Sequence, residues 1–119
     1  MTNWVEKELI KFLRAIAKRV KKDFCIHYKS LNPMVPSDAF YSDPDEEIAG
    51  SCTEDGDIRI KLRKENGKFR SIEFLIDTVL HELAHAACDK THFHKERPAH
   101  PQEWRSAYRR LKKWFRQYE

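Results

Sequence analysis

The sequence has 119 residues, of which 40% are hydrophobic and 35% charged, and its formal net charge is +4. This length supports one hydrophobic core and excludes a catalytic unit joined to a separate binding module, so we expect a single domain over residues 1–119. A mildly basic, charge-rich composition is typical of a soluble protein, and basicity alone identifies no partner.

No segment of the chain predicts a membrane or an export route. A run of about 18 apolar residues does not occur, and the first residues lack the charged and then apolar regions of a signal peptide. We therefore expect a cytoplasmic protein. Three cysteines, Cys25, Cys52 and Cys88, show no CxxC spacing, which favours reduced, mostly buried thiols over a disulfide framework.

In chain order, the first predicted element is a helix over residues 3–22. Asn3 and Glu6 fit a capping box at its start. The residues expected to face the core are Val5, Leu9, Phe12, Leu13, Ile16 and Val20. The cations between them are expected to form a solvated face: Lys11, Arg14, Lys18, Arg19, Lys21 and Lys22.

The middle of the chain predicts a small set of strands. Alternation or β-branched content predicts them at residues 24–29, 39–41, 47–53 and 58–63. Turn residues make the rest of 32–45 a loop, and Gly56 supplies the positive φ that a hairpin turn over residues 54–57 needs. The last strand alternates between a core face of Ile58, Ile60 and Leu62 and a water face of Arg59, Lys61 and Arg63.

A second helix is predicted over residues 71–90, which contain neither Gly nor Pro, with Ser71 as its N-cap. One side is apolar and consists of Ile72, Leu75, Ile76, Val79, Leu80, Leu83, Ala86 and Ala87. His81 and His85 lie on the opposite side, one turn apart, and Glu82 lies at the flank.

The segment His81-Glu82-Leu83-Ala84-His85 is an HExxH motif. Its spacing lets both imidazoles bind one tetrahedral zinc ion, while Glu82 can reach the water on the ion without being a ligand. Zinc lowers the pKa of that water to about 7, and an adjacent carboxylate can take the proton and pass it to the leaving amine. The motif also arises by chance on charged helices. Here, however, the histidines interrupt the most apolar segment of the chain, where an unpartnered polar side chain is costly.

A last helix is predicted to begin at His100 and Pro101, because Pro suits the first helical position. Its apolar stripe consists of Trp104, Ala107, Tyr108, Leu111, Phe115 and Tyr118. The rest of its surface is crowded with Arg and Lys. This basic face is most simply solvated, and nucleic-acid contact is the alternative.

A catalytic zinc ion needs a third protein ligand from beyond His85. His100 is favoured, because the core-packed last helix would hold its imidazole and Trp104 could pack beneath the site. Glu103, on the same helix, is the next candidate, and the loop residues His92 and His94 remain open. Cys88 lies roughly 20° from His81 on the helix wheel, so its thiolate could approach the metal, although a packed thiol is the simpler interpretation.

Together these motifs resemble the catalytic domain of the SprT and WLM families of zinc peptidases. The resemblance covers residues 48–108. It rests on Ala49-Gly50, the basic strand at 58–63, the HExxH motif, and His100-Pro101-Gln102-Glu103-Trp104, which follows the family pattern His-x-x-x-(Phe/Trp). The 14 residues between His85 and His100 exceed the WLM spacing. In size the chain is similar to the stand-alone minigluzincins, which use Glu as third ligand.

The resemblance implies an α+β zincin fold with an N-terminal helix, a small mixed sheet, a zinc-binding helix and a C-terminal helix. It also implies that the strand at 58–63 is the sheet edge that aligns substrate. His81, His85 and His100 would be the Zn²⁺ ligands, and Glu82 the general base and acid.

Two function classes follow. The first is a zinc-dependent endopeptidase acting on a protein or peptide substrate. The second is a nucleic-acid-associated or partner-binding domain with a structural zinc and little or no proteolysis. Glu82 favours the enzyme, because a structural site needs no carboxylate beside the ion and closes all four positions with protein ligands.

Overall fold

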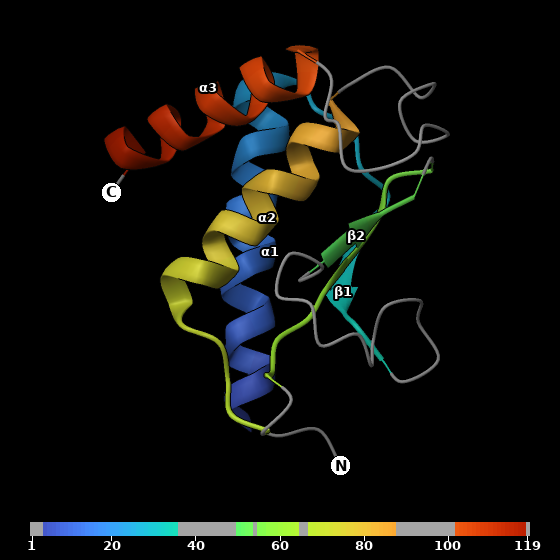
Figure 1. The fold of residues 1–119 in the computed structure, drawn as a ribbon, viewed down its shortest axis with the longest axis vertical. Helices are drawn as coiled ribbons and strands as arrows, with labels where there is room; N and C mark the ends of the chain where they lie inside the picture. The colour runs from blue at the N-terminus through green and yellow to red at the C-terminus, as the bar shows by residue number, and fades with distance from the viewer. Residues whose placement is uncertain (1–3, 36–49, 54, 65–66, 88–101, 119) are drawn as a thin grey trace.

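The structure is a computed structural model that describes residues 4–35, 50–53, 55–64, 67–87 and 102–118. These residues form three helices and one three-stranded sheet. The helices are α1 (Trp4–Phe24), α2 (Ile72–Ala86) and α3 (Gln102–Tyr118), and the strands are β1 (Ser30–Pro33), β2 (Gly50–Cys52) and β3 (Asp57–Ile60). Figure 1 shows α1 and α2 on one side of the sheet, with α3 running across the end of α2. The predicted α+β class is confirmed.

The sheet is mixed, and its strand order is β1-β3-β2. β3 pairs in parallel with β1 and antiparallel with β2. The prediction that residues 58–63 form a sheet edge is therefore wrong, because β3 is hydrogen-bonded on both sides. The predicted hairpin turn, with Gly56 at φ 86°, places β2 beside β3, and β1 occupies the other side. Among the described strands, β2 is the edge that lies next to α2.

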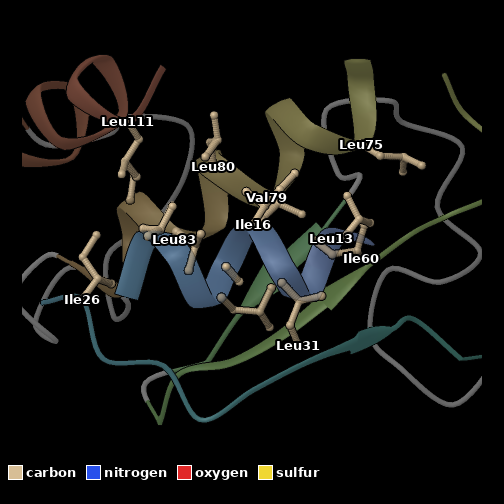
Figure 2. Packing of buried hydrophobic residues seen from close by; sticks show 14 of the residues in the cluster. Leu13, Ile16, Ile26, Leu31, Ile60, Leu75, Val79, Leu80, Leu83 and Leu111 are labelled. Atoms are coloured by element: carbon tan, nitrogen blue, oxygen red, sulfur yellow. The ribbon is translucent and has the colours of Figure 1, made fainter. Parts of the chain in front are cut away.

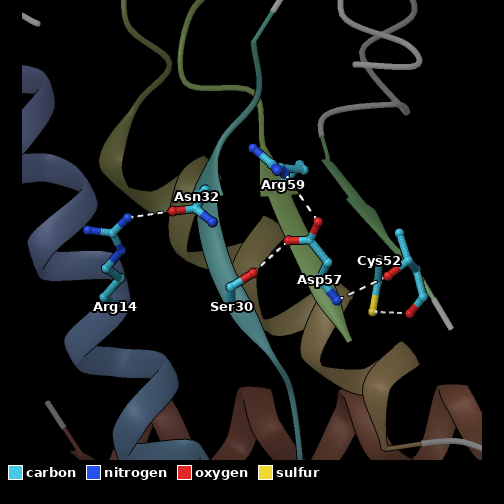
Figure 3. A network of polar contacts seen from close by, with 7 residues as sticks. Arg14, Ser30, Asn32, Cys52, Asp57 and Arg59 are labelled. Carbon is cyan, nitrogen blue, oxygen red and sulfur yellow. Dashed lines mark hydrogen bonds and ion pairs between the residues drawn. The ribbon is translucent and has the colours of Figure 1, made fainter. Parts of the chain in front are cut away.

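The predicted strand at 24–29 is wrong, because α1 continues to Phe24 and Cys25 then adopts a left-handed φ of 55°. β1 begins only at Ser30, where parallel pairing with Asp57 starts. The Ser30 hydroxyl donates a hydrogen bond to the Asp57 carboxylate at 2.6 Å (Figure 3). The expected strand at 39–41 lies outside the described residues, as does the part of the expected strand at 47–53 that precedes β2.

The buried face of α1 contains Leu13, Ile16 and Val20, as predicted, but it lies further from Val5 and Phe12 than expected. It consists of Ile10, Leu13, Ile16, Ala17 and Val20. Val5 and Phe12 are each 45% exposed, so their predicted place in the core is wrong. They lie roughly 80–100° around the helix from Leu13. Arg14 is exposed, as expected. It also joins α1 to β1, because it donates to the Leu31 carbonyl at 2.9 Å and to the Asn32 side chain at 2.6 Å (Figure 3). Asn3 lies outside the described residues.

One apolar cluster joins the three helices to the sheet, as Figure 2 shows. Leu13 of α1, Ile60 of β3 and Leu83 of α2 are each completely buried, and full burial of such a side chain contributes about 1.5–3 kcal/mol. Lys61 was expected to face water but is 8% exposed. The reason is that β3 ends at Ile60, and residues 61–63 run beside residues 69–70 instead of continuing the alternation of the strand.

The predicted start of α2 is confirmed, because the Ser71 hydroxyl accepts a hydrogen bond from the N–H of Phe74 at 3.2 Å. Ile72 is 38% exposed, so its predicted burial is wrong; it occupies the first helical position, beyond the core. In α3, Trp104, Ala107 and Leu111 are buried as predicted. Residues 88–90, 100 and 101 and the side chain of Tyr118 lie outside the described part of the chain.

The thiols differ from the expectation of general burial. Cys25 is exposed and Cys52 is half-buried, and neither is part of a disulfide. Cys88 lies outside the described residues. No helix within the described ranges is long and apolar enough to cross a membrane.

Candidate metal centre

His81 and His85 lie on the same side of α2 and approach each other closely. Their ring centroids are 5.1 Å apart, and the ring planes are tilted by 57°. Both side chains are partly exposed. Zinc–nitrogen bonds of about 2.0–2.1 Å are compatible with two imidazoles at this separation, so the donor pair fits a single zinc ion.

Trp104 of α3 packs against both imidazoles, as its sequence position predicted. Its ring centroid lies 4.7 Å from that of His81, in an edge-on arrangement, and 5.2 Å from that of His85. The indole N–H donates a hydrogen bond to the backbone carbonyl of His81 at 3.2 Å. With 7% of its surface exposed, Trp104 forms a buried wall beside the histidine pair.

Tyr108 lies one turn after Trp104 and extends this wall. Its ring stacks on Trp104 with a centroid separation of 5.0 Å and lies 5.6 Å from the ring of His81. The Tyr108 hydroxyl donates a hydrogen bond to the carboxylate of Asp77, which also pairs with Lys112 at 3.7 Å. Burial, together with the hydrogen bond and charge of Asp77, raises the pKa of Tyr108 well above its usual value.

Glu82 occupies the flank of α2 that faces the sheet. It is 5% exposed, and Gly50 of β2 lies against it. A Cβ atom at position 50 would lie 3.0 Å from Cγ2 of Thr78, 3.3 Å from Cγ of Glu82 and 3.0 Å from the carbonyl oxygen of Arg59. Glycine at this position therefore allows strand and helix to approach closely. The signal in the sequence is an isolated glycine within a strand pattern.

Cys52 is a second neighbour of Glu82 that the sequence did not indicate. It lies opposite Ile58 in the sheet register, as Gly50 lies opposite Ile60. Burial raises the pKa of Cys52 to about 12, and the charges of Glu82 and Asp57 add to the effect.

The third ligand lies beyond the part of the chain that the structure describes. His92, His94 and His100 are outside the described residues, as are Cys88 and the side chain of Glu103. Within the described ranges, no group of three or more His, Cys, Asp or Glu residues is arranged to hold a metal ion. The structure thus brings together His81 and His85 and places Glu82 on the flank that faces the sheet, and His100 stays a prediction.

Two solved structures share this fold. The crystal structure of Wss1 from Saccharomyces cerevisiae has 19% sequence identity, covers 92% of this chain and 77% of its own, and superposes with a TM-score of 0.65. A crystal structure of a Wss1 mutant from the same yeast has 18% identity, covers 93% of this chain and 79% of its own, and gives a TM-score of 0.66. At these identities the likeness concerns the fold.

Comparison of the sequence with curated proteins gave no match. The model of the SprT-like family matches residues 14–119, a range that contains the whole sheet, α2 with its HExxH motif, and α3. The chain therefore belongs to the SprT-like family.

Proposed function

We propose that this protein is a zinc-dependent endopeptidase in which Glu82 is the general base. The observation that carries the proposal is the arrangement on α2. The imidazoles of His81 and His85 are paired with their centroids 5.1 Å apart, and the next residue after His81 is a carboxylate that is 5% exposed and faces the sheet. Membership of the SprT-like family supports the same conclusion, since the resemblance to this family implies zinc peptidase activity.

His81 and His85 would hold the metal, with His100 as third ligand. The support for His100 is indirect: α3 places Trp104, four residues later in the chain, in contact with both imidazoles. When bound, zinc supplies polarisation of the peptide carbonyl and activation of a water molecule. Glu82 would accept a proton from that water and return it to the leaving amine, a role that typically contributes about 10²–10⁴-fold in rate.

The substrate is expected to bind along β2. This strand, and not β3, is the sheet edge beside α2 among the described strands, and Gly50 brings it into contact with Glu82. An extended peptide can add to a sheet edge through backbone hydrogen bonds. A peptide bound along β2 would present its backbone near the carboxylate of Glu82.

A second candidate function is contact with nucleic acid through α3. The exposed positions of this helix are rich in cations: Arg105, Arg109, Arg110, Lys112, Lys113 and Arg116. A one-sided basic helix attracts phosphates through a salt-dependent interaction. If the face binds single-stranded DNA, the double charge reversal Arg109→Glu with Lys113→Glu should abolish the binding. Equal binding by wild type and variant would reject this function.

The metal site is tested by elemental analysis combined with cleavage of a denatured protein. Wild type should contain one zinc per chain and cleave in a zinc-dependent manner. The variant with both His81→Ala and His85→Ala should lose metal and cleavage. His27→Ala is the matched control, because His27 is an exposed histidine in the segment after α1. Stoichiometric zinc in the double variant would reject the site.

A further inference from the structure

Trp104 combines three contacts that each involve the histidine pair. The indole N–H reaches the His81 carbonyl at 3.2 Å, and the ring contacts both imidazoles at centroid distances of 4.7 and 5.2 Å. The carbonyl belongs to a residue inside α2, where a helical N–H already bonds each carbonyl. This second bond therefore fixes where the indole lies relative to the backbone of His81.

The indole is also held by a second aromatic ring of α3. Tyr108 stacks on it at 5.0 Å and is bonded through its hydroxyl to Asp77. Asp77 lies one turn before His81 on α2, just as Tyr108 lies one turn after Trp104 on α3. Two points of α2, the His81 carbonyl and the Asp77 carboxylate, thus anchor a pair of stacked rings from α3. We call Trp104 and Tyr108 the aromatic platform.

We propose that Trp104 is a positioning residue for the metal ligands: the aromatic platform holds the imidazoles of His81 and His85 in place before the metal binds. This inference rests on the proposed function. An imidazole in contact with a fixed ring samples fewer rotamers, so less side-chain freedom is lost when the ion binds. Residues that orient metal ligands typically change metal affinity by about 10–100-fold when they are substituted.

The chain offers a matched control on the same helix. Trp114 also donates its indole N–H to an acceptor on another helix, Asp23 of α1, at 2.8 Å. Trp114→Phe therefore removes the same N–H group and an interhelical hydrogen bond, here to a carboxylate, away from the histidines. Trp104→Phe keeps an aromatic ring and loses the N–H, Trp104→Leu loses both, and Tyr108→Phe loses only the bond to Asp77.

The experiment makes two measurements on each variant: its zinc affinity, by chelator competition, and its absorption spectrum when Co²⁺ replaces zinc. A melting curve of each metal-free variant verifies that it is folded. Trp114→Phe should match wild type. Trp104→Phe should bind zinc several-fold more weakly, and Trp104→Leu about 10–100-fold more weakly, with an altered Co²⁺ spectrum. Tyr108→Phe should give a smaller loss than Trp104→Leu.

If folded Trp104→Leu and Trp104→Phe have the zinc affinity and Co²⁺ spectrum of Trp114→Phe, the inference is overturned and the proposed zinc site still stands. A wild-type protein that binds neither metal would overturn both. Should Trp104→Leu fail to fold, Trp104→Phe decides the question, since a spectrum and affinity equal to those of Trp114→Phe would reject the platform.

Discussion

Gly50 is the residue at which the sheet comes closest to the candidate site. A methyl group there would lie 3.0 Å from the Arg59 carbonyl oxygen and from Cγ2 of Thr78. We expect Gly50→Ala to lower the free energy of unfolding by about 1–3 kcal/mol, the usual cost of overpacking. Urea unfolding measures the change, with Ser51→Ala, on the same strand, as control. A Gly50→Ala protein as stable as wild type would mean that β2 can move away from α2 at little cost.

The thiols of Cys25 and Cys52 should react very differently. Cys25 is exposed, whereas the pKa of Cys52 is raised from 9.0 to about 12 by its burial and by the charges of Glu82 and Asp57. At pH 8.5, iodoacetamide should label Cys25 in the folded protein and label Cys52 only after unfolding, as read by peptide mass spectrometry. Equal labelling rates would show that Cys52 does not lie in the half-buried position beside Glu82.

The raised pKa of Cys52 determines how its contribution to the stability of the folded protein changes with pH. The folded state favours the neutral thiol of Cys52, so its contribution to stability is complete below the ordinary pKa of 9.0 and is lost as pH rises toward 12. Cys52→Ala should therefore reduce the loss of stability between these pH values.

At the scale of the helix, α1 offers a direct test of its orientation. Leu13 is completely buried, whereas its neighbour Phe12 is 45% exposed. Leu13→Ala should cost about 2–5 kcal/mol, the range for a buried leucine, and Phe12→Ala should cost far less despite the larger side chain. Chemical denaturation of the two variants measures both. A larger loss for Phe12→Ala would show that Phe12 lies in the core, as periodicity predicted.

The elements that the sequence predicted well are those fixed by neighbouring residues. Ser71 caps α2 through a bond three residues away, and Gly56 forms the turn between β2 and β3 at a positive φ. β1 was misplaced because its position depends on parallel pairing with Asp57, 27 residues from Ser30. The exposure of Val5 and Phe12 was missed because it depends on which face of α1 packs against α2 and the sheet, and helical periodicity alone does not determine that.

In the candidate site, too, the residues that the sequence predicted are fixed by local spacing, and those that it missed depend on contacts between distant elements. His81, Glu82 and His85 could be identified because their spacing within one helix determines their relative directions. The roles of Gly50 and Cys52, and the bond between Tyr108 and Asp77, depend on how β2 and α3 pack against α2. Apart from the isolated glycine within a strand pattern, which marks Gly50, no local pattern contains that information. Position alone indicated Trp104 as a neighbour of the histidines, but not the bond from its indole to the His81 carbonyl.

At the scale of the whole molecule, zinc should stabilise the fold, because it binds residues that only the folded state brings together. A zinc concentration 100 times the dissociation constant adds about 2.7 kcal/mol, which should raise Tm by roughly 10 °C for a domain of this size. Thermal unfolding with and without zinc measures the shift. The variant with both His81→Ala and His85→Ala should show no shift, and an equal shift in it would place the bound metal elsewhere.

The central claim is that Glu82 supplies the proton transfer of a zinc endopeptidase, and one measurement tests it most directly. Zinc content and the rate of cleavage of a denatured protein are determined for wild type, Glu82→Gln and the control Glu73→Gln, which changes an exposed carboxylate in the first turn of the same helix. We predict that Glu82→Gln keeps one zinc per chain and cleaves about 10²–10⁴-fold more slowly than wild type. Glu73→Gln should keep both the zinc and the wild-type cleavage rate. Cleavage by folded, zinc-loaded Glu82→Gln at the wild-type rate would contradict the account.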